Sequence, residues 1–271
     1  MFVEILSEQE NQGSKLMKYV IFFFFAFYSS ASMNKSICHG SDDRVSSFKS
    51  EIGRALPTKT GRIGRRRYAS ACTITMISKD CAISAGHCLR NLNYIQFQVP
   101  QTNQDRRINH PEKQDIYRVK KDTIKYKNDG AGEDWAVFKI QRNSETGLYP
   151  GQAQGFMQVD FSYPSATLLE ITGYGMDYSP VTSHYTQQTD DGEFVEFEGK
   201  MLHHLVDTTG GNSGSSIVDK ATGKIIGVHS HGGCTTGADR NTGTSIYFNP
   251  EFKMAIKSCL NKTSQESLFQ F

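Results

Sequence analysis

The chain has 271 residues, with 30 Lys and Arg against 28 Asp and Glu and a formal net charge of +2. This balance says little about partners, and no basic face carries interleaved aromatic residues, so nucleic-acid binding has only weak support. The length is sufficient for one large all-β unit or two small barrels with a sizeable core. Six cysteines favour an oxidising compartment.

The N-terminal region carries an apolar run at residues 20–28, preceded by two lysines and followed by small residues at 29–32. This order is typical of a secretory signal peptide, and the run is short for a membrane span. Met17 is the natural start, because Met17-Lys18 leads directly into the run. We therefore predict that residues 1–32 are an N-terminal extension and signal peptide; a retained membrane anchor is the alternative.

Short segments of alternating apolar and polar residues predict strands along the rest of the chain. They lie at 73–77, 94–99, 116–119, 135–140 and 168–172. Segments 216–218 and 225–228 flank a turn-rich connection and predict a hairpin. Only 250–260 looks helical, because a proline opens it and its apolar residues form a stripe. That stripe consists of Phe252, Met254, Ala255, Ile256 and Leu260.

A histidine and an acid come first among the candidate catalytic residues. His87 lies in the string SAGHC at the end of an apolar run, and Asp134 lies at the start of the apolar segment 135–140. An imidazole can take the proton of a serine hydroxyl, which is otherwise a poor nucleophile. A carboxylate can hold the imidazole tautomer and stabilise the imidazolium.

The candidate nucleophile follows in the string TTGGNSGS at 208–215. Here Ser213 sits in a glycine-rich turn whose backbone N–H groups can converge, and acyl-transfer enzymes build a nucleophile and an oxyanion hole together in this way. A flexible loop is the alternative for this string by itself. The upstream histidine and acid favour the catalytic interpretation, with the chain order His, Asp, Ser.

This order and these strings resemble the trypsin-like serine proteases, because subtilisin-like and α/β-hydrolase enzymes carry the same groups in other orders. The likeness covers about residues 37–260 and includes TGYG at 172–175. It also includes IGVHS at 226–230, a strand that lines the family's substrate cleft. Within the family, GSDDR at 40–44 and GGNSGS at 210–215 are similar to the bacterial glutamyl endopeptidases.

The resemblance implies a role for each matching residue. Ser213 is the nucleophile, His87 the general base and acid, and Asp134 the orienting carboxylate. The N–H groups of Gly211 and Ser213 form the oxyanion hole, a device that contributes roughly 10²- to 10³-fold in rate per donor. The resemblance also implies a disulfide between Cys72 and Cys88 beside the catalytic histidine. The partners of the other four cysteines stay open, and free thiols are an alternative.

Two interpretations compete for the specificity pocket. The glutamyl endopeptidases select Glu through a histidine on the cleft-lining strand and a hydroxyl five residues before the nucleophile, which here are His229 and Thr208. Such donors pair with a carboxylate and reject neutral side chains. Asp207 instead occupies the position at which trypsin selects Arg or Lys. Ser230 is a further cleft residue on the strand of His229, and a structural role for that histidine is the alternative.

The residue before the nucleophile is Asn212, where trypsin carries an acid that pairs with the new N-terminus on activation. Trypsin-style zymogen activation is therefore not expected. The glutamyl endopeptidases use the mature α-amino group near the pocket, which here implies a cut close to Ser36 or Ile37. No cofactor is expected; a structural calcium ion is compatible with such a fold, but the sequence does not define a site for it.

The resemblance implies two six-stranded antiparallel β-barrels of the chymotrypsin type with a short C-terminal helix. We place the first barrel at 37–155 with His87 and Asp134, the second barrel and the helix at 156–260 with Ser213, and a tail at 261–271. The expected protein is a monomeric bacterial endopeptidase, secreted or periplasmic, that acts on proteins or peptides after Glu and perhaps Asp. A catalytically silent binding or toxin-like relative is the alternative of another class.

Overall fold

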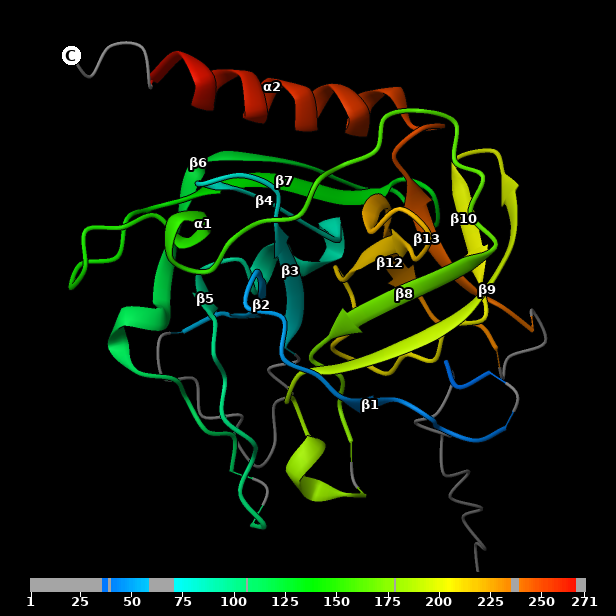
Figure 1. Ribbon diagram of the computed structural model, residues 1–271, viewed down its shortest axis with the longest axis horizontal. Helices are drawn as coiled ribbons and strands as arrows, with labels where there is room; N and C mark the ends of the chain where they lie inside the picture. The colour runs from blue at the N-terminus through cyan, green and yellow to red at the C-terminus, as the bar shows by residue number, and fades with distance from the viewer. Residues whose placement is uncertain are drawn as a thin grey trace, which may run out of the picture. The chain divides into compact units, whose positions relative to one another are not determined.

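The computed structural model describes residues 36–38, 40–58, 71–105, 107–177, 179–234 and 239–266. The predicted signal peptide at residues 1–32 lies outside them. The described chain is built mostly of strands, which form two closed six-stranded antiparallel barrels followed by a C-terminal helix (Figure 1). This confirms the predicted fold class. No helix in the described ranges is long and apolar enough to cross a membrane.

The first barrel closes in the order β2-β3-β4-β7-β6-β5. Its strands are β2 (Ile52–Leu56), β3 (Cys72–Met76), β4 (Cys81–Ser84), β5 (Tyr94–Gln96), β6 (Ile116–Asn128) and β7 (Asp134–Ile140). Every residue of β2, β3, β4 and β7 is buried. A strand that is buried on both faces does not need to alternate, and the sequences of β2 (IGRAL) and β4 (CAIS) show no alternation of apolar and polar residues, so neither strand is predicted.

The second barrel closes in the order β9-β10-β13-β12-β11-β8, because β8 also pairs with β9. Its strands are β8 (Leu168–Gly173), β9 (Gln188–Glu198), β10 (Met201–His204), β11 (Ser216–Asp219), β12 (Lys224–His231) and β13 (Asn241–Ser245). The predicted hairpin is the β11–β12 pair. Strand β9 is not predicted from the sequence, because its second half is largely exposed and rich in acidic residues.

Two elements do not pack on the barrel whose predicted range contains them. Strand β1 (Val45–Ser46), within 37–155, pairs with β9 of the second barrel. Helix α2 (Pro250–Glu266) packs against β4 and β7 of the first barrel and extends into the predicted tail. The chain therefore crosses between the barrels at both ends.

The face of α2 that packs on the first barrel is set by helical period. Phe252, Ala255 and Ile256 are buried, and the Phe252 ring stacks on Trp135 with a centroid separation of 5.3 Å. Met254 belongs to the predicted stripe but is 63% exposed, which corrects that prediction. Two residues after Phe252, it is rotated by about 200° around the helix axis and so faces away from the barrel.

The remaining helical elements are short. They are η1 (Gly86–Arg90), η2 (Lys113–Asp115), α1 (Pro150–Ala153) and η3 (Val181–Ser183). Only η1 carries a predicted site residue.

The two barrels are joined by hydrogen bonds from β3 to the loop before β11. The backbone N–H of Thr73 donates to the carbonyl of Ser213 at 2.9 Å, and its hydroxyl donates to the carbonyl of Gly211 at 2.9 Å. The hydroxyl of Thr75 lies 3.0 Å from that of Ser216. The second barrel's candidate nucleophile loop is therefore positioned by a strand of the first.

Candidate active site

His87 and Asp134, which both belong to the first barrel, are in direct contact. The Asp134 carboxylate accepts a hydrogen bond from the His87 backbone N–H at 2.9 Å and lies 2.6 Å from the ring Nδ1. Asp134 is fully buried, whereas the His87 side chain is 35% exposed. With Nδ1 facing the carboxylate, the neutral imidazole carries its proton there and leaves Nε2 able to accept one.

His87 keeps the Asp134 carboxyl ionised. Burial by itself raises the pKa of this carboxyl, but the hydrogen bonds and charge of His87 outweigh burial, so that the pKa lies below its usual range. The Asp134 backbone is also fixed by Thr244 of β13, whose hydroxyl lies 3.2 Å from the Asp134 N–H and donates to its carbonyl at 3.0 Å. Asp134 is thus an ionised acceptor for the His87 ring.

The turn that carries His87 depends on a glycine. A Cβ at Gly86 would come 1.8 Å from the carbonyl oxygen of Lys127 in β6. Any other residue would push η1 away from the barrel and separate His87 from Asp134.

Ser213 lies next to this pair, in the loop between β10 and β11. Its carbonyl oxygen is 3.6 Å from the sulfur of Cys88, the residue after His87. The next residue, Gly214, donates its N–H to the carbonyl of His229 at 2.9 Å. Within the described chain the Ser213 hydroxyl has no hydrogen-bond partner in the protein, so the position of Ser213 is set by these backbone contacts.

Two peptide groups of this loop are oriented by their carbonyls. The Gly210 carbonyl accepts from the Met176 N–H at 2.8 Å, and the Asn212 carbonyl accepts from the Ser215 N–H at 2.9 Å. In a trans peptide the N–H points opposite to the carbonyl, so the N–H groups of Gly211 and Ser213 point away from these partners. Among the described residues neither N–H has an acceptor, and both are free to donate to a bound oxygen.

An arginine of the predicted N-terminal motif supports the loop. The guanidinium of Arg44 pairs with Asp42 at 2.6 Å and with Asp177 at 2.5 Å, and it donates to the hydroxyl of Thr209 at 2.8 Å. The Arg44 side chain is only 1% exposed. Asn212 also stabilises the loop, because its side-chain oxygen accepts a hydrogen bond from the Thr209 N–H at 3.1 Å.

A second histidine contacts His229. His204 in β10 and His229 in β12 are both buried, and the His204 Nε2 lies 3.2 Å from the His229 Nδ1. The Val206 N–H donates to the His204 Nδ1 at 3.2 Å. Neutral His204 must therefore carry its proton on Nε2 and donate it to His229 Nδ1, which leaves the His229 proton on Nε2.

Both imidazoles are neutral at physiological pH. Burial, followed by the charge of neighbouring histidines, lowers the pKa of His204 to about 3 and places that of His229 well below its usual range. His204 is adjacent to His203 in the sequence, and no motif distinguishes the two. Only the pairing of β10, β13 and β12 in one sheet brings His204 to His229.

Thr208 is fully buried beside the N-terminal segment. Its backbone N–H donates to the carbonyl of Ser36 at 3.1 Å, and its hydroxyl oxygen accepts from the Asn241 amide at 3.5 Å. The same amide donates to the Ser36 carbonyl at 2.8 Å. The hydroxyl proton of Thr208 has no acceptor among the described residues and is available to a ligand.

Ser230 and His231 follow His229 on the cleft strand. The Ser230 hydroxyl is oriented toward the Thr242 carbonyl at 3.4 Å and lies 2.8 Å from the His231 Nδ1. A register shift between His229 and His231 interrupts the alternation of the strand, so His229 is buried while His231 is exposed. The ring of His231 lies beside that of His87, with centroids 6.2 Å apart.

Asp207 faces a different part of the molecule. It is only 3% exposed, and its carboxylate accepts from the Cys38 N–H at 2.6 Å. It lines a cavity of about 250 Å³ together with Asp43 and Asp190, and neither Thr208 nor His229 lines that cavity. Burial and the charge of Asp43 raise the pKa of Asp207 to about 6.

All six cysteines are paired. The bridges are Cys38–Cys234, Cys72–Cys88 and Cys81–Cys259. The second is the bridge that the family resemblance implies. The other two span 196 and 178 residues, so no local pattern in the sequence could pair them. A free thiol, one of the alternatives left open, is not present.

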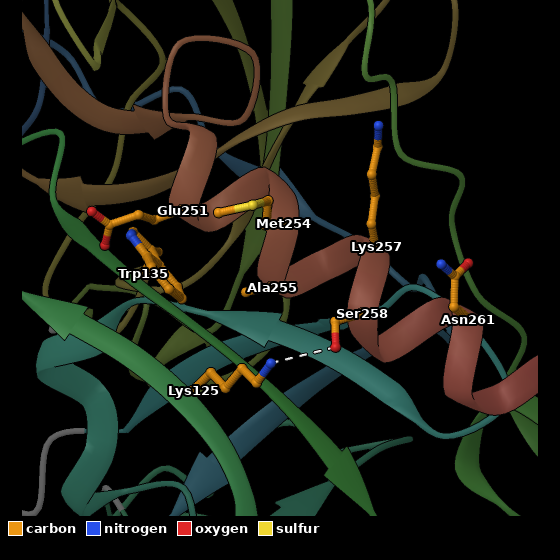
Figure 2. A pocket seen from close by; sticks show the side chains of 8 residues that line it. All are labelled: Lys125, Trp135, Glu251, Met254, Ala255, Lys257, Ser258 and Asn261. Carbon is orange, nitrogen blue, oxygen red and sulfur yellow. Dashed lines mark hydrogen bonds between the residues drawn. The ribbon is translucent and has the colours of Figure 1, made fainter.

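The cavity of about 710 Å³ beside α2 does not belong to this site. It is lined by Lys125, Trp135, Glu251, Met254, Ala255, Lys257, Ser258 and Asn261, and Figure 2 shows their side chains along the helix and the neighbouring strands. None of the predicted site residues is among them.

Two closed antiparallel barrels, with a histidine and an aspartate of one brought next to a serine loop of the other, define a chymotrypsin-like protein. The family model described as Trypsin matches residues 59–251, which is more than half of the chain. The protein therefore belongs to the trypsin family of serine proteases.

Solved structures agree on the fold. A Glu endopeptidase in complex with MPD is 20% identical, with a TM-score of 0.59, and the match covers 81% of this chain and 97% of that one. A protease of Arthrobacter nicotinovorans, Anisep, is 18% identical with a TM-score of 0.55 over 74% and 92%. A thermostable serine protease of an extremophilic microorganism, AL20, is 14% identical with a TM-score of 0.54 over 73% and 91%. A search of curated proteins gives no match.

Proposed function

We propose that this protein is a secreted serine endopeptidase that cleaves after Glu through an acyl-enzyme intermediate. The observation that carries the proposal is the buried His204–His229 hydrogen bond beside the Ser213 loop, because it fixes a neutral imidazole with an outward N–H donor. The likeness to a Glu endopeptidase is in keeping with it.

The proposed chemistry assigns a step to each group. The Ser213 hydroxyl attacks the scissile carbonyl while the His87 Nε2 takes its proton, and Asp134 stabilises the resulting imidazolium. The oxyanion accepts hydrogen bonds from the N–H groups of Gly211 and Ser213. His87 then gives the proton to the leaving amine, and a water molecule activated by His87 hydrolyses the acyl-enzyme.

The proposed pocket recognises a carboxylate through hydrogen bonds. His229 Nε2 and the Thr208 hydroxyl each have a proton to donate, and both residues are buried. A substrate Glu supplies charged acceptors for both donors, whereas a neutral side chain leaves buried donors unpaired. Cleavage after Asp would use the same two hydrogen-bond donors, but the Asp side chain is one methylene shorter than that of Glu.

Cleavage after Arg or Lys through Asp207 is the alternative specificity. Asp207 is almost fully buried, accepts from the Cys38 N–H and shares a cavity with two further carboxylates. These contacts favour a structural role for Asp207 over contact with substrate. The hydrogen-bonded His87–Asp134 pair likewise disfavours a catalytically silent binding module.

Secretion and processing form part of the proposal. Three disulfides suit an oxidising compartment. The Ser36 carbonyl lies against the Thr208 N–H, so a mature N-terminus created close to Ser36 would start beside the proposed pocket. Protein or peptide substrates follow from the family, while the monomeric state and the bacterial origin stay predictions.

The test of the activity is digestion of an unstructured protein by the mature, disulfide-bonded enzyme, with each cut assigned by mass spectrometry. We expect cuts after Glu that disappear in Ser213→Ala. Cuts after Arg or Lys would transfer the specificity to Asp207. No Ser213-dependent cutting would favour the binding-module alternative.

Two variants test the pocket separately. We expect His229→Ala to abolish the preference for Glu, because it removes the outward donor, while Asp207→Ser leaves the preference largely intact. The measurement is kcat/KM on matched peptides with Glu, Gln or Arg before the scissile bond. The opposite pattern would refute the glutamyl pocket.

A further inference from the structure

Three carboxylates from separate segments converge beside β9 of the second barrel. Asp43 follows Cys38 in the N-terminal segment, Asp190 lies on β9 and Asp207 lies in the loop before the proposed nucleophile. One carboxylate oxygen from each lies within 4.8 Å of the others. They line the cavity of about 250 Å³ described above.

These carboxylates have no positive partner in the described chain. None of them forms an ion pair there with a lysine, arginine or histidine, although other acids of the same region do. Asp42 pairs with Arg44 at 2.6 Å, and Asp191 pairs with Lys220. No cationic side chain of the described chain therefore compensates the charge that these carboxylates carry when they are ionised.

A buried oxygen of Asp207 independently indicates that a cation binds here. Asp207 is only 3% exposed, and its Oδ2 is buried with no hydrogen-bond partner among the residues that the structure describes. A buried, unpaired carboxylate oxygen is costly unless a cation or a proton compensates it. The other oxygen, Oδ1, accepts from Cys38, and the Asp190 Oδ2 accepts from the Asp207 N–H at 2.6 Å, so the geometry of the cluster is fixed by the backbone.

The spacing of the oxygens suits calcium. Ca²⁺ binds oxygen ligands at about 2.3 to 2.6 Å, so two oxygens on one ion are separated by at most about 5 Å. The three carboxylate oxygens lie within 4.8 Å of one another, which is within that range. Mg²⁺ requires near-ideal octahedral geometry at shorter distances, and carboxylates from three segments with open solvent on one side fit the more tolerant ion.

We propose that Asp43, Asp190 and Asp207 bind a calcium ion that fastens the N-terminal segment to β9 and to the loop leading to Ser213. The ion would compensate the buried Oδ2 of Asp207 and complete its shell with water on the side of Asp43, which is exposed. Thr208 is adjacent to Asp207 and bonded to Ser36, so the ion would stiffen the wall of the proposed pocket.

The test uses full-length mature protein carrying Ser213→Ala, which prevents self-digestion and makes the result independent of the proposed activity. After removal of metal with EGTA, CaCl₂ is titrated by calorimetry and thermal unfolding is followed in parallel. We expect one site with a dissociation constant of about 10⁻⁴ to 10⁻³ M, as in extracellular calcium modules. At about 100-fold excess over that constant, the melting temperature should rise by roughly 5 to 10 °C.

Two variants and one control locate the site. Asp190→Asn and the exposed Asp43→Asn should each weaken calcium binding at least tenfold and remove the thermal shift. Glu196→Gln is the control, because it removes a charge from the same strand that is paired with Arg240 and lies outside the cavity. It should bind calcium like the parent.

Four outcomes would contradict the proposal. One is the absence of calcium binding at millimolar concentration, and a second is calcium binding that neither Asp43→Asn nor Asp190→Asn weakens. In the third, Asp190→Asn raises the melting temperature without calcium and calcium has no effect on the parent, which would mean that a shared proton compensates the cluster. An equal response to MgCl₂ would also contradict the assignment to calcium.

Discussion

At the scale of single residues, the proposed specificity depends on proton positions. The Val206 N–H determines that His204 accepts at Nδ1, and this in turn determines which nitrogen of His229 carries a proton. Burial keeps both rings neutral, as the lowered pKa values of His204 and His229 show. A backbone amide two residues from His204 therefore orients a donor on another strand.

The Thr208 hydroxyl can be tested in isolation. We expect Thr208→Val to lower kcat/KM for Glu substrates by about 10- to 100-fold, because a hydrogen bond to a charged group contributes about 1.5–3 kcal/mol. Thr208→Ser keeps the hydroxyl and should retain most of the activity. Peptides with Glu or Gln before the scissile bond provide the measurement, and an equal loss on both peptides would contradict recognition of the carboxylate.

At the scale of elements, the site depends on close contacts between backbones. The loop of Ser213 approaches β3 so closely that a Cβ on Gly214 would come 2.2 Å from the Thr73 carbonyl and 2.1 Å from the Ser84 hydroxyl. Helix η1 approaches β6 in the same way at Gly86. Glycines at these contacts allow two barrels to present one site.

A pair of glycine substitutions separates this packing from backbone conformation. Gly214 and Gly223 have positive φ angles of 91° and 66°, but a Cβ at Gly223 meets nothing within 4 Å. Gly223→Ala should therefore cost about 1 kcal/mol. Gly214→Ala should cost several times more or abolish folding, because the Thr73 backbone has to move. Urea unfolding of both variants is the measurement, and similar losses would contradict the packing argument.

At the scale of the whole molecule, the chain crosses between the barrels at its beginning and its end. Strand β1 pairs with the second barrel, and α2 returns to the first, where Cys81–Cys259 fixes it. Cys38–Cys234 fixes the N-terminal segment to the loop after β12. The cleft residues are therefore held by segments distant in sequence, and global stability and the site are linked.

The buried histidines make stability depend on pH. Unfolded histidine titrates near pH 6.5, whereas folded His204 has a pKa of about 3. Between these values the unfolded state binds more protons, so unfolding free energy falls as pH falls, by up to about 1.4 kcal/mol per unit for one histidine. Above pH 6.5 this loss is absent. Asp190 acts in the opposite sense, because burial, together with the nearby charges of Asp43 and Asp207, raises its pKa to about 7.

A variant isolates the histidine contribution. In the Ser213→Ala background, adding His204→Gln should make the decline in unfolding free energy between pH 6.5 and 4.5 shallower, as measured by urea titration at each pH. The comparison leaves Asp190 and Asp207 unchanged in both proteins. Equal slopes would show that His204 is not a buried neutral imidazole.

The sequence by itself determined the fold class, the strongest strands, the hairpin after Ser213 and the pairing of Cys72 with Cys88 through family resemblance. These features are local or carried by short strings: alternation marks half-buried strands, and the strings around His87, Asp134 and Ser213 are distinctive. The fully buried β2 and β4 and the acidic β9 lack that alternation, so the sequence does not predict them.

The tertiary structure alone brought distant residues together. Contacts such as His204 with His229, Arg44 with Thr209, and Cys38 with Cys234 join segments 25, 165 and 196 residues apart. The same holds for the convergence of Asp43, Asp190 and Asp207. Such contacts are set by barrel closure and strand register. Both depend on how side chains pack throughout the two barrels, and no short stretch of the sequence specifies that packing.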